Sequence, residues 1–352
     1  MIDLHIIENE KIAVTSIATY RKWFSSKSNP FVIFGGAYNY SFEGYENVTI
    51  IEENLKGSKK LINLMKRADR IHVHGIFSFW LLGILATHRR LCEKTVWYIW
   101  GDDLYCLTKP KSSIINRFHL AVRRKAYRSI RYVATNVIGD YDLLKSLIHK
   151  EYEFFELRFG NGYISGIEPY INEKNEHEGT NILVGNSATI SNYHLQVFDE
   201  LSRFQNENIR IYVPLSYGSK TYAGSVIARG KELFGDKFIP LTEFIPRDDY
   251  FRLLMSMDVA IFANDRQQAM GNIVALLYAG KKVYMRSDIS SWASIHDEYD
   301  IGVCDYNSLR DETFIEFSSN PFNSEKQMKL VLDMTDTDKY VAAVRRTLIS
   351  ES

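Results

Sequence analysis

A predicted core strand that ends in two adjacent carboxylates is the feature of this chain that most directly suggests chemistry. The apolar and aromatic run Thr95–Trp100 predicts a strand, and Gly101 follows it where the backbone can turn sharply. Asp102 and Asp103 come next. Ligands of open α/β sheets bind outside the carboxyl ends of the strands. We therefore expect these acids to take part in catalysis or to hold polar hydroxyl groups.

A histidine ends another predicted strand, Arg70–His74. Side chains alternate along a strand, so His72 and His74 point to opposite faces, and His74 could face a ligand at the end of the strand. A single histidine is more often structural, and no cysteine or carboxylate stands near enough in the sequence to indicate a metal site. His74 is therefore a candidate for catalysis but not for metal binding.

Two polar loops in the second half of the chain are candidate phosphate sites. Gly185, Asn186 and Ser187 follow the strand-like run Asn181–Val184, and a helix predicted from Asn192 would supply free N–H groups to an anion. An ordinary strand-to-helix loop, capped by a side chain, fits these residues equally well.

The second loop lies between the strand-like run Val259–Phe262 and an apolar helix over Gly271–Ala279. A diphosphate at the start of that helix would meet its dipole, and glycine would allow a close approach of the backbone. A solvated loop with amide caps is the alternative, which we favour less because the loop follows a predicted central strand. The residues concerned are Arg266, Gln267, Gln268 and Gly271.

Two further loops follow predicted strands in this half. Tyr217, after Ile209–Val213, could pack on a ring or a sugar, and Leu241–Arg247 could contact a flat base through its backbone. A plain surface loop fits Leu241–Arg247 equally well, and an ordinary surface tyrosine is the favoured interpretation of Tyr217.

The segment between Leu104 and Gly139 has no acidic residue and eight basic ones, with apolar residues between them. A basic amphipathic helix can lie on anionic lipid, where each charge contributes about 1 kcal/mol near the surface. A solvated helix face is the alternative. We favour a lipid headgroup or a pyrophosphate over nucleic acid, because few aromatic side chains are placed to stack on bases. The basic residues are Lys109, Lys111, Arg117, Arg123, Arg124, Lys125, Arg128 and Arg131.

Length and composition indicate two domains in a reducing compartment. The chain has 352 residues, and 45% of them are hydrophobic. This length exceeds that of most single-domain proteins, so two domains are expected. Residues 1–175 hold 25 basic and 18 acidic residues, and the remainder holds 18 and 25. We expect neither a membrane span nor a secretory signal, and three scattered cysteines indicate neither disulfides nor zinc. The neutral overall charge argues against a dedicated nucleic-acid-binding protein.

Strand-like and helix-like segments alternate through both halves, which predicts an α/β protein with parallel sheets. The pattern is interrupted by a glycine-rich and polar stretch, the best linker candidate. We predict one domain over 1–165, a linker over 166–180 and a second domain over 181–322. A C-terminal helix is expected within 323–352.

Four motifs together resemble a known family. They are Trp97–Leu107 (WYIWGDDLYCL), Ile182–Asn192 (ILVGNSATISN) with His194, Val213–Tyr217 (VPLSY), and Arg266–Gly271 (RQQAMG). Their order and spacing, from about residue 70 to 295, resemble the enterobacterial TDP-4-acetamido-4,6-dideoxygalactose (TDP-Fuc4NAc) transferases of glycosyltransferase family 56, which help build enterobacterial common antigen.

The resemblance implies a GT-B fold, in which two Rossmann-like doubly wound domains face each other across a cleft. It implies transfer of a sugar from a TDP-sugar donor to a polyprenyl-diphosphate-linked saccharide at the cytoplasmic face of the membrane. No metal cofactor is expected. We expect the C-terminal half to bind the donor and the N-terminal half the acceptor, with a peripheral contact to anionic membrane.

The resemblance also ranks the candidate residues. Asp103 holds the family position and is the first candidate for the general base, with His74 second; Asp102 replaces a small residue of the family. The expected donor-binding residues are Gly185, Asn186, Ser187, Asn192, His194, Tyr217, Arg266, Gln267, Gln268 and Gly271. The residues expected toward the acceptor or membrane are Asp102, Tyr105, Arg117, Arg123, Arg124, Lys125 and Arg128.

Two other functions fit the two-domain pattern. A sugar-nucleotide epimerase would turn over its nucleotide sugar without an acceptor. A two-lobed sugar-binding protein would not be an enzyme, would normally carry an export signal, and would have no evident use for the basic segment. We favour the transferase over both.

Overall fold

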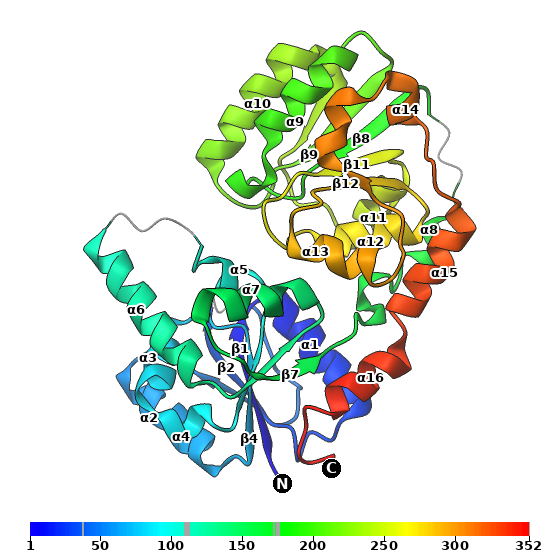
Figure 1. The fold of residues 1–352 in the computed structure, drawn as a ribbon. Coiled ribbons are helices and arrows are strands. Elements are labelled where there is room, and N and C mark those ends of the chain that lie inside the picture. Colours follow the sequence, from blue (N-terminus) through cyan, green and yellow to red (C-terminus); the bar gives the residue numbers. More distant parts are fainter. Residues whose placement is uncertain (37–38, 109–112, 172, 174–176, 352) are drawn as a thin grey trace. The chain divides into compact units, whose positions relative to one another are not determined.

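A computed structural model describes residues 1–36, 39–108, 113–171, 173 and 177–351 of the chain (Figure 1). It divides into two compact units. The N unit comprises Met1–Arg158 together with Asp338–Ser352, and the C unit comprises Phe159–Thr337.

The N unit is built on a seven-stranded parallel sheet with the order β3-β2-β1-β4-β5-β6-β7. One face carries the core of α2, α3, α6 and α7, and the other face packs against α1 and the C-terminal segment. The strands are β1 (Asp3–Asn9), β2 (Phe31–Gly36), β3 (Val48–Ile51), β4 (Arg70–His74), β5 (Thr95–Tyr98), β6 (Tyr132–Thr135) and β7 (Glu153–Glu156). The helices are α1 (Lys11–Trp23), α2 (Leu55–Arg67), α3 (Phe79–Thr87), α4 (Arg89–Cys92), α5 (Asp102–Tyr105), α6 (Ile114–Ser129) and α7 (Ile138–Ile148).

The C unit contains a six-stranded parallel sheet with the order β10-β9-β8-β11-β12-β13. The strands are β8 (Thr180–Val184), β9 (Ile209–Pro214), β10 (Phe238–Leu241), β11 (Val259–Phe262), β12 (Lys282–Met285) and β13 (Cys304–Asp305). The helices are α8 (Glu168–Ile171), α9 (His194–Leu201), α10 (Lys220–Phe234), α11 (Arg247–Met255), α12 (Met270–Tyr278), α13 (Ser290–Trp292), α14 (Phe314–Ser318) and α15 (Ser324–Met334).

Both sheets have the same topology, with the first strand near the centre and the chain order reversing beside it. The reversal falls between β1 and β4 in the N unit and between β8 and β11 in the C unit. The predicted pair of Rossmann-like, doubly wound domains is therefore confirmed. Ligands of such sheets bind at the carboxyl ends of the strands at this switch point, so the loops that follow β1 and β4, and those that follow β8 and β11, are the candidate ligand-binding loops.

The C-terminal segment differs from the single helix expected within 323–352. It forms α15 and then α16 (Thr337–Arg345), and the tail after α15 returns to the N unit. Val341, Val344 and Leu348 join the buried cluster on the α1 face. The N–H groups of Ile349 and Ser350 donate to the carboxylate of Asp3 at 3.1 and 2.7 Å. Burial of these apolar side chains on a second surface explains why the helix is interrupted.

The border between the units also lies earlier than the predicted linker 166–180, since the C unit begins at Phe159. Within the predicted linker the chain forms α8, and residues 172 and 174–176 lie outside the described part. Among the described residues, no helix is both long enough and apolar enough to cross a membrane.

Candidate functional site

The two predicted phosphate loops lie side by side at the switch point of the C unit. The amide of Gln268, in the loop after β11, donates from Nε2 to Asn186 Oδ1 at 2.9 Å and to Ser187 Oγ at 3.3 Å, in the loop after β8. Its Oε1 accepts from Ser191 Oγ at 2.7 Å. One glutamine side chain therefore ties together two loops that are about 80 residues apart in the sequence.

Asn192 and His194 lie buried beneath the loop after β8, and both are 0% exposed. Asn192 Oδ1 accepts from the N–H of Asn186 at 3.0 Å and from Asn264 Nδ2 at 3.2 Å. Burial lowers the pKa of His194 to about 4, so its ring is neutral near pH 7. Gly185 has φ +68°, and a side chain there would collide with His194 Nε2 and Asn192 Oδ1. Asn192 and His194, both predicted to bind the donor, therefore hold the loop in place and do not reach the surface.

The second predicted phosphate loop leads into the amino terminus of α12. Its N-cap, Ala269, has a left-handed φ of +60° and contributes no side-chain cap. A Cβ added at Gly271 would meet no atom within 4 Å, so the space beside the first turn is open. Arg266 and Gln267 lie half-buried in the same loop. The dipole and N–H groups of a nine-residue helix favour a phosphate at this position.

Two exposed aromatic residues stand on the adjoining loops. Tyr217 and Phe244, after β9 and β10, are each 77% exposed. The Tyr217 loop is fixed to the loop after β8, because the N–H of Ala188 donates to the carbonyl of Tyr217 at 2.6 Å. The loop after β8 thus connects an exposed ring on one side with Gln268 on the other.

Asp103 occupies a position unlike that expected of a base. Its carboxylate is 1% exposed; Oδ2 accepts from Trp97 Nε1 at 2.6 Å and from the N–H of Ile76 at 3.1 Å, and Oδ1 accepts from the N–H of Trp100 at 3.1 Å. Burial raises the pKa of Asp103 although these donors oppose the shift. A general base must come within about 3 Å of the hydroxyl it deprotonates. The enclosed Asp103 instead has the geometry of a residue that joins the loops after β4 and β5.

His74 is likewise enclosed, at 4% exposure. Its Nε2 lies 3.0 Å from His5 Nδ1, and its ring stacks on Tyr98 with centroids 4.5 Å apart. Burial, with a smaller effect of His72, lowers the pKa of His74 to about 3. A base is most effective when its pKa lies near the working pH, so this histidine is poorly suited to the role.

Glu8, which the sequence analysis missed, lies at the carboxyl end of β1 beside the switch point of the N unit. It is half-buried, and burial raises its pKa to about 7, with further effects from Glu10, Glu53 and Asp103. The N–H of Ser78, at the start of the α3 segment, donates to it. The sequence could have indicated Glu8, because the strand-like run Ile2–Ile7 is followed by this acid, just as Thr95–Trp100 is followed closely by Asp102.

The residues expected toward the acceptor or membrane fall into two groups. Tyr105 is buried, with its hydroxyl donating to Asp140 Oδ1 at 2.8 Å, and Arg123 Nη1 donates inward to the carbonyl of Ile76 at 2.8 Å. These two side chains hold the N unit together and are not available to a membrane. Asp102, Arg117, Lys125 and Arg128 are exposed and Arg124 is half-buried, whereas Lys109 and Lys111 lie outside the described residues.

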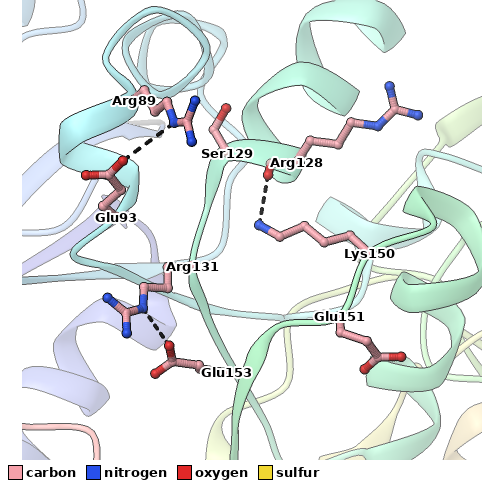
Figure 2. Close-up of a pocket in the computed structure, with 8 residues that line it drawn as sticks. All are labelled: Arg89, Glu93, Arg128, Ser129, Arg131, Lys150, Glu151 and Glu153. Carbon is pink, nitrogen blue, oxygen red and sulfur yellow. Dashed lines mark hydrogen bonds and ion pairs between the residues drawn. The ribbon is translucent and has the colours of Figure 1, made fainter.

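Arg128 also lines a pocket of about 550 Å³ in the N unit (Figure 2). The pocket lies where β6 and β7 begin, at the sheet edge opposite to the switch-point loops. Its basic residues are largely satisfied, for Arg131 pairs with Glu153 at 2.6 Å and Arg89 with Glu93 at 3.5 Å. The switch-point loops are therefore stronger candidates for the functional site than this pocket.

In the described part of the chain, no three His, Cys, Asp or Glu side chains come close enough together to bind a metal ion.

The chain is similar to a known protein family and to several solved structures. A model of the family described as 4-alpha-L-fucosyltransferase, glycosyl transferase group 56, matches residues 42–318. Among solved structures, a glycosyltransferase from Rickettsia africae is similar with a TM-score of 0.67 and 14% identity, over 98% of this chain and 96% of that one. The Anabaena protein Alr3699/HepE, solved in complex with UDP and glucose, has a TM-score of 0.69 and 12% identity, over 99% and 100% of the two chains. These likenesses show that the fold is GT-B, as expected.

Proposed function

Because the chain belongs to glycosyltransferase family 56 and is a nucleotide-sugar-dependent glycosyltransferase, we propose the substrates on which it acts. The donor is a TDP-sugar carrying a deoxyamino sugar similar to Fuc4NAc, and the acceptor is a polyprenyl-diphosphate-linked saccharide of bacterial surface-polysaccharide assembly. The observation that carries the donor half of the proposal is the pair of loops joined by Gln268 beside the amino terminus of α12.

The donor diphosphate binds at these two loops in this proposal. The N–H groups of the first turn of α12 meet the phosphate oxygens, and Arg266 adds positive charge. The Gly185–Ser187 turn lines the same place, with its Gly185 and Asn186 N–H groups bonded to the carbonyl of Ile261 and to Asn192 Oδ1. Asn192 and His194 act by holding the turn, since neither is exposed. Tyr217 offers an exposed ring to the nucleoside. Helix dipole, amide groups and arginine stabilise the leaving diphosphate, so we propose that the reaction needs no metal ion.

The proton of the acceptor hydroxyl is taken up in the N unit, and we propose Glu8 in place of Asp103 and His74. Glu8 stands at the switch-point edge and is partly accessible, whereas the other two are enclosed. A Cβ at Gly35 would lie 3.4 Å from both a Glu8 oxygen and a Glu53 oxygen, so the two carboxylates flank one glycine. Their mutual repulsion favours protonation of Glu8 during turnover. Asp103 is then a positioning residue for the loops that surround the acceptor.

A lipid-linked acceptor places the enzyme at the cytoplasmic face of the membrane, to which we propose that it binds peripherally. The exposed basic residues of α6 support this location, because anionic lipid attracts an acid-free basic helix.

A thermal-shift screen of TDP-, UDP- and GDP-sugars tests the donor. We expect TDP-sugars to raise the melting temperature, because a ligand that binds only the folded state stabilises it. The matched variant Arg266→Ala should lose most of this shift without a lower melting temperature in buffer alone. Stabilisation by UDP- or GDP-sugars only would contradict the proposed donor, and turnover of the donor without any acceptor would favour an epimerase.

A further inference from the structure

The first two turns of α6 expose large apolar side chains. Ile114 is 84% exposed, Ile115 68% and Phe118 60%, and every residue from 113 to 119 is exposed. The helix is held to the N unit by its second half, where Ala126 and Tyr127 are buried. The exposed turns therefore extend from a firmly packed base.

Two more exposed apolar residues lie at the start of the neighbouring helix α3. Phe79 and Trp80 are each 43% exposed, and the ring of Phe79 lies 4.3 Å from that of His119. Phe79 is the first residue of α3 and contacts His119 of α6. The part of α6 that precedes His119 therefore extends past the end of α3 (Figure 1). We call Phe79, Trp80, Ile114, Ile115 and Phe118 the α6 tip.

The remainder of the outer face of α6 is basic. Ile114, Phe118 and Lys125 are spaced by four and seven residues, which places them on one side of the helix. Arg117 and Arg128 are exposed beside them. The helix contains no acidic residue, and these three basic side chains make no ion pair with any residue that the structure describes. The face thus combines an apolar end with uncompensated positive charge.

We propose that the α6 tip enters the surface of a bilayer that contains anionic lipids, with Arg117, Lys125 and Arg128 against the lipid phosphates. Helices that lie in a membrane interface pair an apolar face with a lysine- and arginine-rich one. The core of a protein–protein interface is instead depleted of charge, so the unpaired basic side chains favour lipid over a protein partner. This inference deepens the proposed function, because it names the surface by which the enzyme would approach a lipid-linked acceptor.

Co-sedimentation with vesicles tests the proposal without any substrate. The full-length protein is mixed with vesicles of phosphatidylcholine and phosphatidylglycerol in a two-to-one ratio, and with phosphatidylcholine alone. We expect binding to the anionic vesicles that weakens with salt. Ile114→Gln/Phe118→Gln should reduce the partition coefficient about 100-fold, since removing each large apolar side chain from the lipid costs about a factor of ten. Arg117→Gln/Lys125→Gln should reduce it about 30-fold on anionic vesicles only, since each lost charge costs about a factor of five.

The matched control is Leu55→Gln/Ile315→Gln, which changes two exposed apolar residues elsewhere, 64% and 76% exposed, and should bind like the wild type. All variants should keep the wild-type melting temperature because the changed side chains are exposed. The proposal is overturned if the wild type does not bind, if the tip variant binds as well as the control, or if the tip variant instead dissociates a dimer in the absence of vesicles. Failure of sugar transfer with vesicle binding intact would contradict the proposed function and leave the docking surface standing.

Discussion

Two carboxylates near the same sheet edge of the N unit, Glu8 and Asp103, illustrate how environment decides the role of a residue. Asp103 has donors on both oxygens and is 1% exposed. Glu8 keeps access to the surface and has its pKa raised to about 7 by burial and by neighbouring acids. A proton acceptor needs access and a pKa near the working pH, and only Glu8 combines them.

Glu8→Gln should lower kcat by about 10²- to 10⁴-fold, the usual contribution of a general base. In the wild-type enzyme, activity should rise with pH through about 7 as Glu8 loses its proton. The glutamine variant should lack this rise when kcat is measured across the range.

Glu10→Gln provides the matched comparison for that experiment. The charge of Glu10 raises the pKa of Glu8, so its removal should move the rise in activity to lower pH while the plateau remains. Asp103→Asn should keep the rise but lower the melting temperature, since an amide nitrogen would face the N–H donors. A Glu8→Gln enzyme with an unchanged pH profile would exclude Glu8 as the base.

At the scale of elements, the loops after β8 and β11 are the unit that builds the proposed donor site. Each loop is short and could be predicted from the apolar run before it. Their pairing depends on the parallel contact of β8 with β11, and on Gln268, which bonds to the Asn186 and Ser191 side chains. A contact between residues so far apart in the sequence has no local signal.

Gln268→Ala should separate the two loops. We expect the dissociation constant for TDP to rise about tenfold and the free energy of unfolding to fall by about 1–2 kcal/mol, because buried acceptors and donors lose their partner. Calorimetric titration and thermal unfolding measure the two effects. Gln205→Ala, which removes an exposed amide in the same unit, should change neither quantity. Unchanged TDP affinity in Gln268→Ala would remove this loop pair from the donor site.

At the scale of the whole molecule, the N unit contains three stacked histidines in its core. The rings of His5 and His72 lie 4.5 Å apart, and His5 contacts His74. Burial lowers the pKa of all three. Asp3 connects these histidines to the C-terminal tail, because its carboxylate bonds to His72 at 2.9 Å and accepts from the N–H of Ser350. Burial raises the pKa of Asp3, but these bonds outweigh it and lower the pKa to about 2.

This cluster predicts loss of stability in mild acid. The unfolded histidine has a pKa of about 6.5 and the folded His74 one of about 3, so the unfolded chain binds more protons between these values. The free energy of unfolding should therefore fall as pH drops below 6.5, by about 2 kcal/mol at pH 5 from His74 alone. Glu8 opposes this effect in part, because its raised pKa stabilises the folded state as pH falls from about 7 to 4.5.

Thermal unfolding of the wild type, His74→Phe and the exposed-site control His296→Gln at pH 7.5 and 5.0 measures the effect. The melting temperature of His74→Phe should decrease less than that of the wild type between pH 7.5 and 5.0. His296→Gln should show the same decrease as the wild type. An equal loss in all three proteins would assign the acid sensitivity to other groups.

The sequence alone was sufficient for the architecture and for placing the loops of the proposed donor site at strand ends. Apolar runs of four to seven residues identified most of the strands, since a strand buried on both faces of a parallel sheet must be apolar. The edge strand β7 has only two apolar residues in succession, Phe154 and Phe155, between two glutamates, and it was not predicted. Gly185 and Gln268 were singled out correctly as loop residues at strand ends, because turn residues act locally.

Only the tertiary structure decided which polar residues are accessible. Asp103, His74, Asn192 and His194 all lie at strand or helix ends, where sequence reasoning expects ligands, yet each is enclosed by parts of the chain distant in sequence. The break between α15 and α16 likewise depends on an apolar surface of the N unit. Residue type and spacing determine what a group can do chemically, whereas burial, pKa and partners arise from long-range packing. That packing encloses Asp103 and leaves Glu8 partly exposed, which is why we propose Glu8 as the base.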